Sequence, residues 1–233
     1  MEIIVFESED LHMKCRITSV LVGIMFKKAF RILDDAGAIF DDILYEQGSS
    51  QFPNQYFPQI EYAGFQKVLR NDETGNYLNL FADNVVYCHN ITSIGKTESE
   101  IDAVIQRVEK AIVPAVIDAH ELAVSRLGFV YTVEITPDML KKFKTKYFKD
   151  NVDVSAFRFS VSEGVENAIA DKNMQDYYNT IYTISREKEK YQISFDFQQY
   201  FRPLKPNWHD CHSSSFFAKA RKEFEEKLYK ELE

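Results

Sequence analysis

Residues 97–135 have the sequence TESEIDAVIQRVEKAIVPAVIDAHELAVSRLGFVYTVEI, in which the hydrophobic spacing changes from that of a helix to that of a strand. Hydrophobic residues recur every three or four positions as far as Leu122, which predicts one long amphipathic helix. Gly128 predicts the end of this helix. Hydrophobic and polar residues then alternate over 129–135, as they do in a half-buried strand.

Two further signals refine the predicted helix. Thr97 lies three residues before Glu100, which is the spacing of a capping box at a helix start. Pro114 lacks a backbone N–H and removes one hydrogen bond, so we expect it to kink or divide the helix.

The same order of elements is predicted on both sides of this stretch. The first half has a strand at 13–19, a helix at 25–45, extended segments at 59–69, 77–82 and 85–91, and the long helix. The second half has a strand at 129–135, a short helix ending near 148, strands at 156–161, 178–185 and 191–197, and a helix at 213–232.

These elements predict an α+β fold with two pseudo-repeated halves, each strand–helix–three antiparallel strands–helix. The halves are residues 1–126 and 127–233, either as separate units or as one integrated domain. The repeat is one of element order, because residue identity between the halves is negligible. The two antiparallel sheets could form one continuous sheet or pack face to face.

Composition narrows the class of protein. The net charge of −8 and pI near 5.3 argue against a nucleic-acid partner, because non-specific binding to nucleic acid rests on a cationic surface. The best local basic run contains Lys141, Lys142, Lys144 and Lys146, and we interpret it as a solvated helix face.

Three cysteines without framework spacing predict reduced thiols and a cytoplasmic location. Neither a signal peptide nor a membrane-spanning segment is predicted.

The 19 Phe and 13 Tyr residues predict sheet-rich cores, because aromatic side chains favour strands and bury large areas. A surplus of exposed rings would instead mark a surface for a partner protein.

Three segments carry a resemblance to a known family: residues 125–131 (SRLGFVY), the C-terminal hairpin with residues 191–197, and a terminal stretch with His212 ahead of Phe217 and Phe224. In these the chain resembles a sporadically distributed bacterial family of roughly 250 residues with no assigned function. The resemblance implies no catalytic residues. A looser analogy is to export-chaperone-like folds, in which sheets backed by helices offer apolar grooves to unfolded clients.

The best metal-like group is the run His209, Asp210, Cys211 and His212, with Cys88 and His89 as distant partners. Imidazole and thiolate ligands suit zinc, but adjacent Cys211 and His212 seldom reach one ion. We therefore expect this segment to begin the last helix, with Asp210 or Ser213 as its N-cap. A Cys–His nucleophile pair is conceivable at Cys88 or Cys211. At Cys88 and His89 it is disfavoured, because neighbours in a strand point to opposite faces.

Acidic pairs are the other candidate group: Asp34–Asp35, Asp41–Asp42 and Asp72–Glu73. We interpret them as solvated surface residues, because acid–base catalysis needs two carboxylates in one concave site. A magnesium-binding nuclease site could be assembled from four more distant residues: Asp83, Glu134, Asp196 and Asp210. No Walker loop, dinucleotide turn, nucleophile elbow or HExxH motif occurs in the sequence.

The sequence therefore assigns no catalytic residue, no cofactor and no metal site. We expect a non-catalytic protein-binding or assembly module of the bacterial cytoplasm that self-associates or binds a protein partner. It could be chaperone-like, or an accessory of a mobile-element or defence system. The alternative is a metal-dependent hydrolase that uses the region from His209 to His212.

Overall fold

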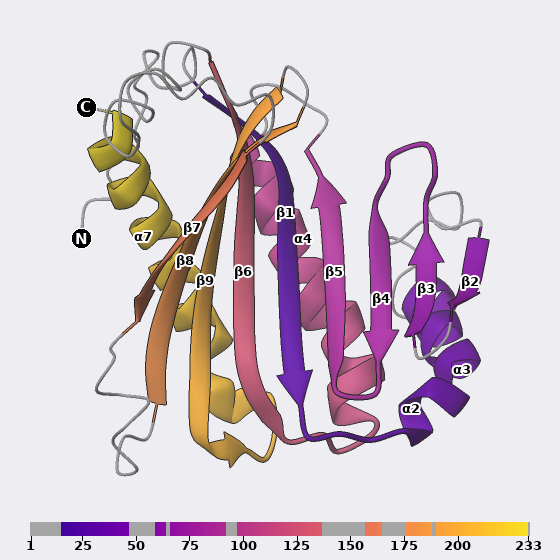
Figure 1. The fold of residues 1–233 in the computed structure, drawn as a ribbon. Helices are drawn as coiled ribbons and strands as arrows, with labels where there is room; N and C mark the ends of the chain where they lie inside the picture. The colour runs from indigo at the N-terminus through magenta and orange to yellow at the C-terminus, as the bar shows by residue number, and fades with distance from the viewer. Residues whose placement is uncertain are drawn as a thin grey trace.

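The computed structural model describes residues 15–46, 59–63, 66–91, 97–136, 157–164, 176–187 and 190–232. These ranges form one nine-stranded antiparallel sheet with helices packed against one of its faces (Figure 1). The strands are β1 (Cys15–Phe26), β2 (Gln59–Ala63), β3 (Gln66–Arg70), β4 (Tyr77–Phe81), β5 (Asn84–Asn90), β6 (Val124–Ile135), β7 (Phe157–Gly164), β8 (Asp176–Glu187) and β9 (Lys190–Lys205). The predicted α+β class is confirmed.

The strand order is β2-β3-β4-β5-β1-β6-β9-β8-β7, and every neighbouring pair is antiparallel. Strands of the first half lie on the β1 side of the central β1–β6 pair, and those of the second half lie on the β6 side. The two halves therefore share one continuous sheet. The proposed boundary at 126–127 lies inside β6, and the equivalence of the two halves stays a prediction.

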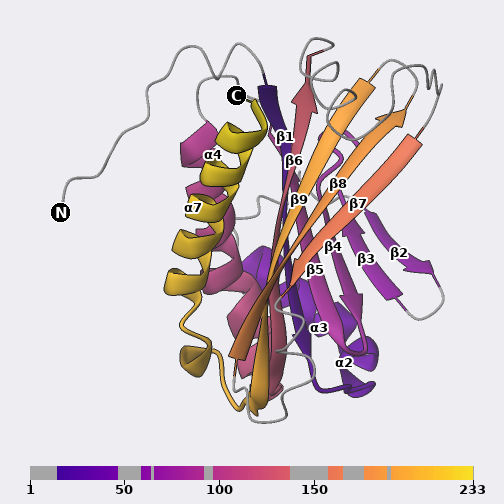
Figure 2. The same ribbon diagram turned by 60° about the vertical axis from the view of Figure 1, so that its left-hand side comes forward.

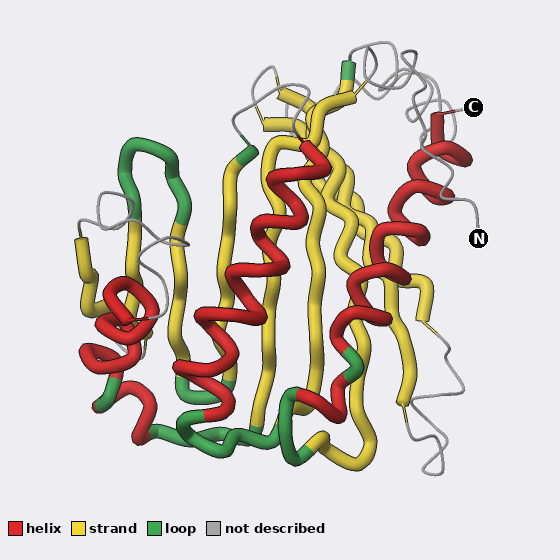
Figure 3. Tube along the Cα trace, turned by 180° about the vertical axis from the view of Figure 1, so that it is seen from behind, coloured by secondary structure: helices red, strands yellow, loops and turns green. Residues whose placement is uncertain are grey.

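The helices cover one face of the sheet, as the view from behind shows (Figure 3), and no described helix lies over the other face, which is toward the viewer in Figure 1. They are α2 (Arg31–Asp34), α3 (Ala36–Asp41), the π-helix η1 (Asp42–Glu46), α4 (Thr97–Arg107), the π-helix η3 (Val108–Asp118), the short 3₁₀ helix η4 (His209–Cys211) and α7 (Ser213–Leu232). The turned view shows α4 and α7 side by side on the covered face (Figure 2). Among the described helices, none has the length and apolar character that crossing a membrane requires.

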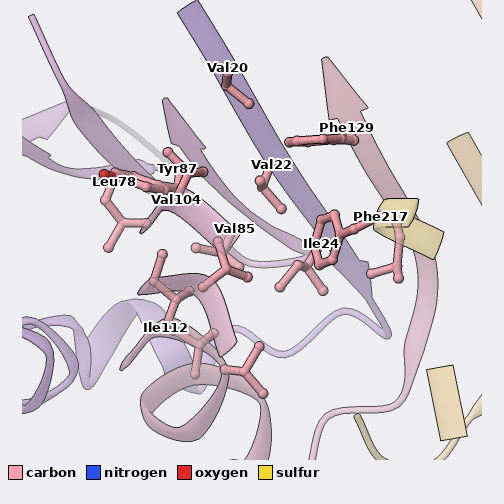
Figure 4. Packing of buried hydrophobic residues seen from close by; sticks show 14 of the residues in the cluster. Val20, Val22, Ile24, Leu78, Val85, Tyr87, Val104, Ile112, Phe129 and Phe217 are labelled. Carbon is pink, nitrogen blue, oxygen red and sulfur yellow. The ribbon is translucent and has the colours of Figure 1, made fainter. Parts of the chain in front are cut away.

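The core lies between the sheet and these helices. Side chains from the central strands, such as Ile24 and Phe129, point toward residues of the helices, such as Val104 and Phe217 (Figure 4). Aromatic pairs attach α7 to the sheet: the rings of Tyr131 and Phe224 stack with centroids 4.2 Å apart, and those of Phe129 and Phe217 meet edge to face at 5.3 Å. Such pairs stabilise beyond the area they bury.

The expectation that aromatic rings form the core is confirmed for eleven of them: Phe26, Phe40, Tyr87, Phe129, Tyr131, Phe195, Phe197, Phe201, Phe216, Phe217 and Phe224. Among the described aromatic residues, only Phe30, at 58%, counts as an exposed large hydrophobic residue. Exposed rings therefore mark no partner surface in the described part of the chain.

The long predicted helix differs from the structure at two points. It changes from α to π geometry at Val108 and continues through Pro114, so the proline does not divide it, and the alternative of a kink stays a prediction. It also ends at Asp118 instead of near Gly128, because Glu121 takes a left-handed conformation (φ 49°) and the chain enters β6. Non-glycine residues rarely adopt this conformation, so the sequence carried no glycine signal for the true end.

Two strand predictions are also corrected. The first strand continues to Phe26, because Val20, Val22 and Ile24 keep facing the helices after the predicted end at residue 19. The single extended segment predicted over 59–69 is the antiparallel pair β2 and β3. The short helix predicted to end near residue 148 lies outside the described residues, as does the basic run from Lys141 to Lys146.

Candidate functional site

The open face of the sheet is the candidate functional surface. On β1 the even-numbered residues Val20, Val22 and Ile24 are buried under the helices, whereas the odd-numbered Leu21 and Met25 face the other way and are partly exposed. Each neighbouring strand continues this alternation, because side chains in register share a face. We call the surface opposite the helices the open face.

Two glycines lie directly opposite each other at the centre of the open face. Gly23 of β1 pairs in register with Gly128 of β6. A Cβ added at Gly23 would meet no atom within 4 Å, and one at Gly128 would meet only Asp196 Oδ1 and the Gly23 carbonyl, both at 3.9 Å. Neither glycine has a positive φ. The fold therefore requires glycine at neither position for space or backbone conformation, and the pair leaves the backbone uncovered.

Apolar side chains surround the glycine pair on its β5 side and along the two central strands. They are Leu21, Met25, Val86 and Val130, all partly exposed, with the buried Cys88 beside Leu21. Antiparallel sheets with one solvated face usually carry polar residues on that face. This apolar region departs from that pattern, and exposed apolar patches are typical of sites that bind partners.

A hydrogen-bonded polar network covers the other side of the glycine pair, on β6, β8 and β9. Gln198 lies opposite Gly128; its side-chain N–H donates to Asp196 Oδ2 (2.6 Å) and its Oε1 accepts from Tyr200 (2.8 Å) and Asn179 (3.3 Å). Arg126 donates to the Tyr200 hydroxyl at 3.1 Å and lies over the same ring. The network holds these side chains in one arrangement on the open face, with Gln198 itself buried among them.

Asp196 is the anionic member of this network. Partial burial raises the pKa of its carboxyl, whereas the Gln198 hydrogen bond and the nearby Arg126 charge act in the opposite direction. Among the described residues, no side chain or backbone group donates to Asp196 Oδ1, which lies beside Gly128. The open face therefore presents one carboxylate oxygen with unused hydrogen-bonding capacity.

The segment from His209 to His212 forms the approach to α7, as expected. Cys211 is buried and its Sγ lies 3.6 Å from the Asn207 carbonyl, while His209 and His212 are exposed. Burial raises the pKa of the Cys211 thiol to about 12, so it stays protonated at neutral pH. Within the described ranges, no three His, Cys, Asp or Glu side chains are placed to hold a metal ion.

The predicted capping of α7 is not the one observed. The side chain of Asp210 accepts a hydrogen bond from Asn207, and the Ser213 hydroxyl donates to Glu109 of η3 at 2.9 Å. The backbone carbonyl of His212 accepts from Phe216 instead, with His212 in a left-handed conformation. A local hydrogen bond with Asn207 and a tertiary one with Glu109 thus take the side chains that the sequence favours as caps.

Cys88 and His89 lie on opposite faces, as the strand alternation predicts. Cys88 belongs to the open face, where it pairs in register with Tyr77 and Leu21. Burial raises the pKa of its thiol. His89 lies under α4, so the two side chains form no nucleophile pair.

The acidic pairs are solvated, as predicted, at Asp34, Asp35, Asp41, Asp72 and Glu73, all of which are exposed. The four residues of the hypothetical magnesium site are not brought together. Asp83 lies in the β4–β5 turn, Asp210 lies in η4, and Glu134 and Asp196 lie on the open face at separate register positions.

A buried ionisable cluster between β5 and α4 has no signal in the sequence. Arg107 donates to the Tyr87 hydroxyl at 3.1 Å, and the His89 Nδ1 lies 3.2 Å from both groups. His89 Nε2 lies 3.5 Å from Glu100, the residue that the sequence placed in a capping box. In the sequence, His89 belongs to a strand pattern, whereas Glu100 and Arg107 belong to a helix pattern. Only the packing of α4 on the sheet brings them together.

This cluster predicts acid sensitivity. Burial, together with the Arg107 charge, lowers the pKa of His89, although Glu100 opposes the shift. Because the unfolded chain then binds the proton more readily, the contribution of His89 to stability is present above its unfolded pKa and is lost as the pH falls. We expect the free energy of unfolding to decrease from pH 7.5 to pH 5, as measured by urea titration.

The control for this prediction is His209→Gln, which removes an exposed histidine. The His209→Gln variant should keep the pH dependence of the natural chain, whereas His89→Gln should be less stable at pH 7.5 and flatter in its pH profile. An equally steep profile in the His89→Gln variant would contradict this role of His89.

Comparison with known proteins adds no family assignment. No protein-family model matches the chain, and no curated protein matches it. Among solved structures, Methanococcus jannaschii TBP is matched at 12% sequence identity over 93% of this chain and 99% of that chain, with a TM-score of 0.25. A TM-score of this size carries no argument about fold or function. The resemblance to a bacterial family of unassigned function stays a prediction.

Proposed function

We propose that this protein is a non-catalytic module that binds a partner protein through the open face of its sheet. The observation that carries the proposal is the uncovered face itself: the described helices pack on one side of the sheet, and Asp196 supplies the only described side-chain atom within 4 Å of a Cβ added at Gly23 or Gly128. A partner can approach the backbone there, with apolar contacts on one side and polar ones on the other.

The character of the surface supports a protein partner. Protein interfaces combine an apolar centre with polar groups that form hydrogen bonds around it. Leu21, Met25 and Val130 supply the apolar part, and the network around Gln198 supplies fixed donors and acceptors. The formal charge of −8 favours a partner with a basic surface and disfavours nucleic acid.

The experiment is affinity capture from an extract of the native cells with three immobilised proteins. They are the natural chain, Leu21→Asp on the open face, and Gln106→Asp on the exposed side of α4. The two variants change the charge equally. We expect proteins retained by the natural chain to be retained by Gln106→Asp and lost from Leu21→Asp, measured by quantitative mass spectrometry.

Equal retention by all three proteins, with each one shown to be folded, would place binding elsewhere and contradict the proposal. The metal-dependent hydrolase stays an untested alternative, with no described contact in its favour. Elemental analysis of the purified protein tests it, since it requires a stoichiometric metal that a His209→Ala, His212→Ala variant loses.

A further inference from the structure

Asp196 has one carboxylate oxygen, Oδ1, that its hydrogen bond from Gln198 leaves unused. On β9 it lies opposite Val130 of β6 and Ile181 of β8, so it is a carboxylate between apolar neighbours. An acidic residue at this position is not needed for strand formation, and Asp is among the residues depleted in strands. A ligand that binds its carboxylate would account for an acidic residue at this position.

The carboxylate is oriented by the network around it. Gln198 donates to Oδ2, and because the Gln198 carbonyl accepts from both Tyr200 and Asn179, the orientation of its amide is set. Oδ2 is thereby occupied, and Oδ1 is left for a further donor at the edge of the glycine pair. An acceptor held in advance in this way binds a ligand without first being ordered.

The surroundings select a cationic side chain over a neutral donor. A partly buried carboxylate gains more from a charged N–H donor than from a neutral one. Val130 and Leu21 continue from Asp196 across β6 and β1 as an apolar path. Lysine and arginine side chains lay their methylene groups on such surfaces while the charged end reaches an anion.

We propose that Asp196 Oδ1 binds the charged end of a lysine or arginine side chain from an extended segment of the partner protein, with the methylene groups of that side chain on Val130 and Leu21. This assignment rests on the proposed function, whose partner it specifies as basic. The overall negative charge of the chain accelerates the approach of such a segment.

The test uses a fluorescein-labelled heptalysine peptide and fluorescence anisotropy at physiological salt. Asp196→Asn is compared with Glu73→Gln, an exposed residue in the β3–β4 turn, because each change removes one negative charge. We expect Asp196→Asn to weaken binding about tenfold, since it removes a charge-assisted pair, and Glu73→Gln to weaken it less than twofold. Equal affinities of the two variants would overturn the assignment.

A second variant tests whether weaker binding by Asp196→Asn comes from a change in fold instead of from the lost carboxylate. Gly128→Val places a side chain beside Asp196 Oδ1 without removing charge, and it should weaken heptalysine binding as Asp196→Asn does. Analytical sedimentation of the natural chain and of the Asp196→Asn variant shows whether a second copy of this chain occupies the open face. If the natural chain forms dimers that Asp196→Asn dissociates, the occupant is a second copy of this chain, and the proposal of a separate basic partner is overturned.

The two proposals can fail separately. If Asp196→Asn retains the captured proteins that Leu21→Asp loses, the open face binds a partner but Asp196 does not hold its basic side chain. If Leu21→Asp also retains them, the proposed function itself is wrong.

Discussion

An Ile24→Asp variant is expected not to fold, whereas a Leu21→Asp variant is expected to fold with nearly the stability of the natural chain. Both residues belong to β1, but Ile24 is 1% exposed under the helices and Leu21 lies on the open face. In register, Ile24 faces Val85 of β5 and Leu127 of β6, and neither can pair with a carboxylate. The new charge would be buried without a partner.

The expected loss of folding free energy in the Ile24→Asp variant has two parts. An unpaired buried charge costs several kcal/mol even after the protein relaxes, and loss of the buried Ile side chain adds about 1.5–3 kcal/mol. Together they approach the total stability of a typical domain, about 5–15 kcal/mol. Circular dichroism and urea unfolding of both variants measure the difference, and two variants of equal stability would contradict the assignment of the two faces.

Replacement of both central glycines by valine is expected to stabilise the fold and abolish capture of the partner. Valine favours strands, and positions 23 and 128 have no positive φ and no close neighbour to a Cβ. A gain of up to about 1 kcal/mol per site is expected, because glycine also loses more backbone freedom on folding. The two side chains would cover the backbone at the centre of the open face.

A matched control for the glycine variant is Gly37→Ala, because a Cβ added at Gly37, as at Gly23, would meet no atom within 4 Å. It lies in α3, on the helix side of the sheet, and is exposed. This change should also stabilise the fold, by about 0.5–1 kcal/mol, and leave capture intact. Loss of capture in the Gly37→Ala variant would mean that capture responds to stability instead of to the open face.

The elements with regular hydrophobic spacing could be predicted from the sequence. The alternation over 129–135 predicted a half-buried strand, and its hydrophobic residues Phe129, Tyr131 and Val133 are buried in β6. These signals are local, because each depends on the period of one element. The α+β class follows from them.

The site could not be predicted in the same way, since it depends on register between distant segments. Gly23 and Gly128 become neighbours only when β1 pairs with β6, and Gln198 joins them only when β9 pairs with β6. Asp196 was identified as a possible metal ligand because its residue type is visible in the sequence. Its free oxygen and its apolar neighbours are visible only in the assembled sheet.

The most direct test of the open face as the binding surface is the glycine variant measured twice on one preparation. Urea unfolding gives its stability, and quantitative capture from native cells gives its partner binding, each beside the natural chain. We predict a more stable protein that retains none of the partners. A more stable protein that retains all of them would show that the partner does not occupy the open face, and would contradict the account.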